Sequence, residues 1–127
     1  MLDRVSPTPT IGVKDLKVAK EFYQNKLGLN LVGDEDDGDC VQFYRSGNGT
    51  IEIYKSNFAG TNKTTAMTWA MGDDFETEVE SLRKKGVEFE HYNMPDTTLD
   101  GDIHVMKDMK AAWFKDPDGN ILCLHDH

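Results

Sequence analysis

The sequence predicts an α+β protein built from two similar halves, and three observations support this prediction. A strand pattern followed by a helix pattern occurs twice, and an aspartate precedes each helix while a glycine follows it. These residues are Asp15 and Gly28 in the first half and Asp73 and Gly86 in the second, at an offset of 58 residues. Strand patterns follow each helix, and the last two form a hairpin at residues 111–124. A repeat on this scale describes the whole fold rather than one local element.

Composition limits the possible functions. With 127 residues, the chain is expected to form a single domain, 1–127, with half-modules at about 1–60 and 61–127. The net charge of −9 and the lack of a basic stripe disfavour nucleic acid and anionic membranes as partners. No apolar run is long enough for a membrane-spanning helix. Two cysteines inside strand patterns suggest no disulfide framework, so we expect a cytoplasmic protein.

The first half is expected to begin with a strand at residues 8–13. Asp15 is then placed to cap a helix that Gly28 ends. Apolar residues at helical spacing form one face of this helix: Leu16, Ala19, Tyr23 and Leu27. A strand at 29–32 follows.

An acidic segment, Asp34–Asp39, is interpreted as a solvated hairpin turn. The EF-hand calcium pattern fails there, since counting back from Gly38 puts Gly33 at the first ligand position and Tyr44 at the last. Alternating residues predict strands at 40–45 and 50–54. The polar residues at 55–64 are expected to connect the two halves.

The second half repeats this order. A strand is expected at 66–71, and a helix follows whose apolar face consists of Phe75, Val79 and Leu82. A further strand starts at 87–90. Residues 93–110 are expected to be a long irregular loop, either a lid over a binding site or a plain surface excursion. The final hairpin turns at Asp116-Pro117-Asp118-Gly119.

Several motifs resemble the vicinal oxygen chelate superfamily, which includes glyoxalase I, extradiol dioxygenases, and fosfomycin and bleomycin resistance proteins. They are Val13-Lys14-Asp15-Leu16, Phe22-Tyr23, Leu27-Gly28-Leu29, Ile51-Glu52-Ile53-Tyr54 and Asp116-Pro117-Asp118-Gly119-Asn120. The resemblance implies two βαβββ modules that form a curved mixed sheet around a pocket. It also implies a homodimer, in which halves are sometimes exchanged between subunits.

Metal-dependent members of this superfamily hold a divalent ion with four residues on pocket-facing strands. Spacing from the motifs places these positions at Thr8, Glu52, Met67 and Cys123. Only Glu52 is a usual ligand, so the resemblance implies no catalytic metal and no cofactor here. An improvised site of Glu52, Cys123 and His104 stays open, as does a role for His104 as a polar contact or general acid-base group.

Period-two alternation from Glu52 predicts the wall of a small-molecule pocket. Its expected members are Thr8, Thr10, Glu52, Tyr54, Met67, Trp69 and Cys123, with Gln42 and Tyr44 as further candidates. Met67, Trp69 and Cys123 can also be interpreted as plain core, and this interpretation is favoured for Cys123. Glu52 lies between Ile51 and Ile53, where burial of an unpaired carboxylate is costly, so it is the candidate general base.

The predicted function is metal-independent binding of a small, partly apolar organic molecule. This would serve sequestration or a metal-free lyase or isomerase reaction. A divergent, metal-dependent glyoxalase I-like lyase is the alternative. A module without any ligand is a third possibility.

Overall fold

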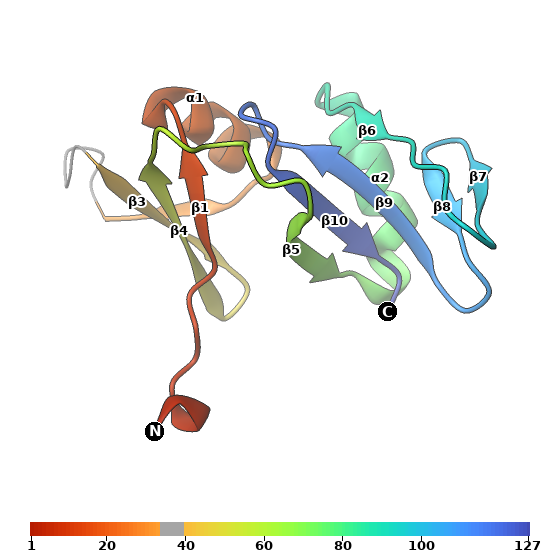
Figure 1. The fold of residues 1–127 in the computed structure, drawn as a ribbon, viewed down its shortest axis with the longest axis horizontal. Helices are drawn as coiled ribbons and strands as arrows, with labels where there is room; N and C mark the ends of the chain where they lie inside the picture. The colour runs from red at the N-terminus through yellow and green to blue at the C-terminus, as the bar shows by residue number, and fades with distance from the viewer. Residues whose placement is uncertain (34–39) are drawn as a thin grey trace. The chain divides into compact units, whose positions relative to one another are not determined.

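The structure, a computed structural model, describes residues 1–33 and 40–127 and divides into two compact units, Met1–Thr61 and Asn62–His127 (Figure 1). The expected acidic turn at 34–39 lies outside the described residues. Each unit combines one α-helix with one mixed sheet, which confirms the predicted α+β class. None of the helices in the described part of the chain is both long and apolar enough to cross a membrane.

Unit 1 contains a four-stranded sheet in the order β1-β4-β3-β2. β1 is parallel to β4, and the other neighbouring strands are antiparallel. Its elements are a 3₁₀ turn η1 (Leu2–Arg4), β1 (Thr10–Val13), α1 (Leu16–Lys20), a π-helical segment η2 (Glu21–Lys26), β2 (Asn30–Val32), β3 (Val41–Ser46) and β4 (Gly49–Lys55).

The first helix begins as the sequence predicts. The carboxylate of Asp15 accepts hydrogen bonds from the backbone N–H groups of Lys17 and Val18, at 2.8 and 3.4 Å. The helix then widens, because the N–H of Leu27 donates to the carbonyl of Phe22 five residues earlier. Phe22 and its neighbour Tyr23 are both buried. The sequence pattern anticipated only Tyr23.

The core of unit 1 lies between this helix and one face of its sheet. Ile51 and Ile53 of β4 are buried there, and the rings of Tyr23 and Tyr44 lie 6.1 Å apart. The hydroxyl of Tyr44 donates to Gln42 Oε1 at 2.9 Å, and burial raises the pKa of Tyr44 to about 12. The expectation that Gln42 and Tyr44 share a face with Glu52 is therefore wrong, because both lie on the helix side.

Unit 2 contains a larger sheet in the order β5-β10-β9-β8-β7, with β6 also paired to β9. β5 is parallel to β10, as β1 is to β4. Its elements are β5 (Thr65–Ala70), a 3₁₀ turn η3 (Gly72–Asp74), α2 (Phe75–Lys84), β6 (Phe89–Glu90), β7 (Thr98–Asp100), β8 (Ile103–Val105), β9 (Lys110–Lys115) and β10 (Ile121–His125).

Helix α2 packs on one face of this sheet, which we call the helix face of unit 2 (Figure 1). Its predicted apolar residues, Phe75, Val79 and Leu82, are all buried. The Nζ of Lys110 lies 3.0 Å from Glu76 Oε1 on α2, which shows the side of β9 that meets the helix.

A hairpin at 98–105 lies within the segment 93–110, which was expected to be irregular. β7 and β8 pair across a turn at Gly101, whose φ is +62°. β8 continues the sheet by pairing with β9. This hairpin is held to α2 by Asp102, whose Oδ2 accepts from Arg83 Nε and Nη2 at 3.0 and 2.7 Å, while Oδ1 lies 2.8 Å from His91 Nε2.

The turn between β9 and β10 is organised by a buried aspartate. Asp116 Oδ1 accepts from the backbone N–H groups of Asp118 and Asn120, both at 2.9 Å. Its other oxygen accepts from the Asn120 side-chain amide at 2.7 Å. These bonds explain why the D-P-D-G-N motif closes this hairpin, with Gly119 at a φ of +92°.

Candidate functional site

The sheet of unit 1 has a second face, opposite the one on which Ile51 and Ile53 are buried, and we call it the open face of unit 1. The strand register places Thr10 and Phe43 on either side of Glu52, and Tyr54 follows two residues along β4. Three apolar or aromatic side chains of this face remain substantially exposed: Val32 at 42%, Phe43 at 38% and Tyr54 at 41%. A half-buried carboxylate thus lies within an accessible apolar surface, as is common in small-molecule sites.

Thr10 fixes the position of the Glu52 carboxylate. Its Oγ1 lies 3.1 Å from Glu52 Oε2 and 2.9 Å from the carbonyl oxygen of Thr8. The backbone supports this contact, because the Glu52 N–H donates to the carbonyl of Pro9 at 2.9 Å. Among the described residues, no ion pair or other hydrogen bond reaches this carboxylate.

Tyr54 is positioned by the absence of a side chain at Gly12, its register partner on β1. A Cβ at residue 12 would lie 3.8 Å from Tyr54 Cζ and 3.1 Å from Ser56 Cβ. The Tyr54 ring therefore extends across β1 over the glycine. This leaves the space beside Glu52 bounded by Phe43 and Thr10.

Unit 2 also has a sheet face opposite its helix, which we call the second face of unit 2. Cys123 of β10 is paired there with Thr68 of β5 on one side and Trp113 of β9 on the other. Trp113 Nε1 donates to Thr65 Oγ1 at 3.1 Å, and its ring lies 4.9 Å from that of His104. Trp113 was not anticipated as a site residue, although the register of the final hairpin pairs it directly with Cys123.

His104 is fully buried in this face. Its Nε2 accepts the backbone N–H of Tyr92 at 2.9 Å, which assigns the ring hydrogen of the neutral form to Nδ1. Nδ1 is buried and has no partner of hydrogen-bonding geometry among the described residues, and neither has the hydroxyl of Tyr92. Burial lowers the pKa of His104, opposed by the backbone of Ala111 and helped by the charge of His91.

Cys123 is not a reactive thiol. Its side chain is only 5% exposed, and burial raises its pKa to about 11, with only a small opposing effect from Thr68. Burial therefore favours the neutral thiol, which is a weak nucleophile.

Three predicted site residues, Met67, Trp69 and Thr8, do not lie on these faces. Met67 and Trp69 are register partners of Leu122 and Leu124, so they lie on the helix face of unit 2. Met67 is 9% exposed and belongs to the core. This follows from strand alternation, because Thr68 between them is paired with Cys123 on the second face. Thr8 precedes β1 and contributes only its carbonyl to the contact of Thr10.

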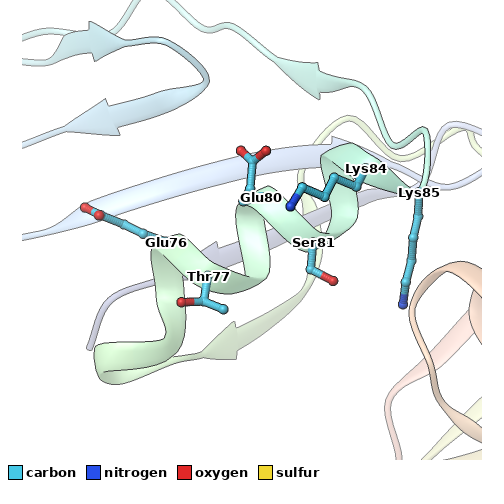
Figure 2. A pocket seen from close by; sticks show the side chains of 6 residues that line it. All are labelled: Glu76, Thr77, Glu80, Ser81, Lys84 and Lys85. Carbon is cyan, nitrogen blue, oxygen red and sulfur yellow. The ribbon is translucent and has the colours of Figure 1, made fainter.

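A separate surface hollow follows the solvent side of α2 (Figure 2). The side chains that line it come from successive turns of the helix and do not converge on one point. They are Glu76, Thr77, Glu80, Ser81, Lys84 and Lys85. This open, mixed-charge surface has none of the apolar enclosure expected of a ligand site.

Residues 2–124 match the family described as the glyoxalase/bleomycin resistance protein/dioxygenase superfamily. The chain belongs to this superfamily. Solved structures agree on the fold. The glyoxalase family protein from Enterococcus faecalis is 21% identical, with a TM-score of 0.71 and coverage of 98% of this chain and 99% of that chain. The fosfomycin resistance protein FosX from Mesorhizobium loti is 15% identical, with a TM-score of 0.68 and coverage of 98% and 92%.

A lactoylglutathione lyase from Agrobacterium tumefaciens is similarly related, at 15% identity and a TM-score of 0.68, with coverage of 96% of this chain and 92% of that chain. No curated protein matches the chain. At these identities the solved structures establish the fold of this superfamily member and nothing finer.

The described residues can be compared with the ligand set of a chelated divalent ion. No group of three or more His, Cys, Asp or Glu residues with metal-binding geometry occurs in residues 1–33 and 40–127. Beside Glu52, the register of unit 1 places the Thr10 hydroxyl and the apolar Phe43, and in unit 2 it pairs Thr68 with Cys123. Neither pair supplies the His and carboxylate set that Zn²⁺, Ni²⁺ or Fe²⁺ prefers.

Proposed function

We propose that this protein binds a small, partly apolar organic molecule on the open face of unit 1, without a catalytic metal. The observation that supports this best is the setting of Glu52. Its carboxylate has Thr10 as its single hydrogen-bond partner among the described residues, beside exposed Phe43 and Tyr54. Such a group is costly to keep on an apolar surface, and a polar ligand atom offsets that cost.

Glu52 is also the residue that would act as the general base if the bound molecule is converted. Its carboxylate is accessible and held at a defined position by Thr10. We propose a metal-free lyase or isomerase step as one use of the site and sequestration as the other. The second face of unit 2, with Trp113 and buried His104, is a further candidate for contact with an apolar ligand. A homodimer in the cytoplasm, with both cysteines reduced, completes the proposal.

The first test is elemental analysis of the purified, untagged protein, combined with thermal unfolding in Ni²⁺, Zn²⁺, Co²⁺ and Mn²⁺. We expect no stoichiometric transition metal and no metal-dependent rise in melting temperature. One metal per subunit, together with a thermal shift that is lost in Glu52→Gln, would overturn the metal-free proposal. The thermal shift is expected from a bound metal because an ion that binds the folded state stabilises it, increasingly with ion concentration. Such a result would favour the divergent, metal-dependent glyoxalase I-like lyase.

A further inference from the structure

The Thr10 hydroxyl lies between two acceptors and can donate to only one of them, so the other can accept from a ligand. Oγ1 of Thr10 lies within bonding distance of two oxygens, the Thr8 carbonyl at 2.9 Å and Glu52 Oε2 at 3.1 Å. A carbonyl and a carboxylate are both acceptors only, and a hydroxyl has a single hydrogen to donate. One of the two acceptors is therefore left to another donor, from water or from a ligand.

The shorter distance indicates which acceptor the hydroxyl serves better. Donation to the Thr8 carbonyl leaves Glu52 Oε2 facing only the lone pairs of Thr10 Oγ1, which is an unfavourable contact. No Lys or Arg forms an ion pair with Glu52 in the part of the chain that the structure describes. A donor brought by a ligand would bond to the carboxylate and leave the Thr10 hydrogen with Thr8.

The neighbours of Glu52 restrict that donor further. Phe43 lies directly opposite Glu52 on β3, where cross-strand Cβ atoms are about 4.5–5.5 Å apart. Tyr54 lies two residues along the same strand and exposes 41% of its surface. Aromatic faces beside a carboxylate attract a cation as well as an apolar body. The whole chain has a net charge of −9, which favours the approach of a cation.

Among the described strand residues, Arg45 is the basic side chain whose register places it on the same face, two residues from Phe43 along β3. It is exposed and would attract an anion instead. Glu52 is closer to the centre of the face, between Thr10 and Phe43, so the carboxylate governs the part of the surface with aromatic neighbours. The anionic alternative is tested directly below.

We propose that the ligand is a protonated amine on a planar apolar body, with its N–H group bound to Glu52 and its body against Phe43 and Tyr54. This inference rests on the proposed function, because it names the chemical class that the same site selects. It concerns binding alone and requires no bond to form or break.

The test uses three probes of one shape and different charge: 2-naphthylmethylamine, 2-naphthylmethanol and 2-naphthoate. Binding to the full chain is followed by calorimetry and by NMR shifts of the Phe43 and Tyr54 amides. We expect the amine to bind at least tenfold more tightly than the alcohol, a difference of about 1.4 kcal/mol. The naphthoate is expected to bind most weakly.

Two variants separate the site from bulk charge. Glu52→Gln is expected to remove the preference for the amine and to leave the alcohol unchanged. Glu88→Gln removes the same charge from an exposed position in unit 2 and should leave the preference intact. A circular-dichroism spectrum like that of the wild type confirms that each variant is folded.

Each outcome has one meaning. If the alcohol or naphthoate shifts the Phe43 and Tyr54 amides but the amine has no advantage, the amine inference is wrong and the proposed binding face stands. If the amine preference survives in Glu52→Gln or is lost in Glu88→Gln, the role of Glu52 is wrong. If no probe shifts either amide, both the inference and the proposed function are overturned.

Discussion

The burial of His104 leads to a pH dependence of stability that can be calculated in sign. Its ring is 0% exposed, and burial holds its pKa below the usual value. As pH falls, the unfolded chain therefore takes up a proton before the folded protein does. The contribution of His104 to stability is fully present above about pH 6.5, the ordinary histidine pKa, and declines as pH falls toward the folded-state pKa.

The size of the effect is limited by one proton. The free energy of unfolding changes by at most about 1.4 kcal/mol per pH unit through this residue. His104→Phe removes the titration and keeps an aromatic ring against Trp113. It also removes the acceptor for the Tyr92 N–H, at a cost of about 1–3 kcal/mol. Loss of the unpaired Nδ1 offsets a cost of similar size. We expect the net change at pH 8 to be within about 1 kcal/mol.

Urea denaturation at several pH values between 8 and 5 measures both quantities. The unfolding free energy of the wild type should fall more steeply below pH 6.5 than that of His104→Phe. His127→Gln, which removes an exposed imidazole at the C-terminus, should keep the wild-type slope. Parallel curves for the wild type and His104→Phe would refute the argument from burial. A loss well above 3 kcal/mol at pH 8 would show that Nδ1 is in fact satisfied.

Three further predictions test positions in both units. Met67→Ala should lower the unfolding free energy by about 2–4 kcal/mol in urea denaturation, because it opens a cavity in the core. Thr68→Ala, at an exposed position of the second face, should change it by less than about 0.5 kcal/mol. Equal losses in the two variants would contradict the assigned register. Asp116→Ala should cost about 2–4 kcal/mol in the same assay through three lost hydrogen bonds, and a neutral result would mean that the turn forms without them. Gly12→Val should displace the Tyr54 ring, seen as shifts of its ring protons in NMR spectra, since even a Cβ would lie 3.8 Å from that ring.

Local patterns with one dominant cause were predictable from the sequence. The cap at Asp15 and the buried face of α2 depend on neighbours within one or two helical turns. The turn at Asp116 depends on five consecutive residues. In each case the chemistry of a short segment decides the structure, so the sequence contains the whole argument.

The assignment of faces in unit 2 failed for a physical reason. Period-two alternation puts Met67 and Trp69 on one face and Thr68 on the other, so a starting position that is one residue off reverses every assignment. The register pairs Met67 with Leu122 and gives the exposed position to Thr68. The missed hairpin at residues 98–105 is a different case. Its Gly101-Asp102 turn is a recognised hairpin signal, and the short strands on either side concealed it.

The register shows that Thr10 and Thr68 hold equivalent positions in the two units. Thr10 and Thr68 are separated by 58 residues, the same offset that relates the two helices. Each lies on the first strand of its unit and is paired in parallel with a residue of the last strand. That partner is Glu52 in unit 1 and Cys123 in unit 2. The two halves thus share a backbone arrangement but differ in the side chain that defines its chemistry. Because Cys123 is buried and protonated while Glu52 is accessible, selection of a charged ligand depends on unit 1.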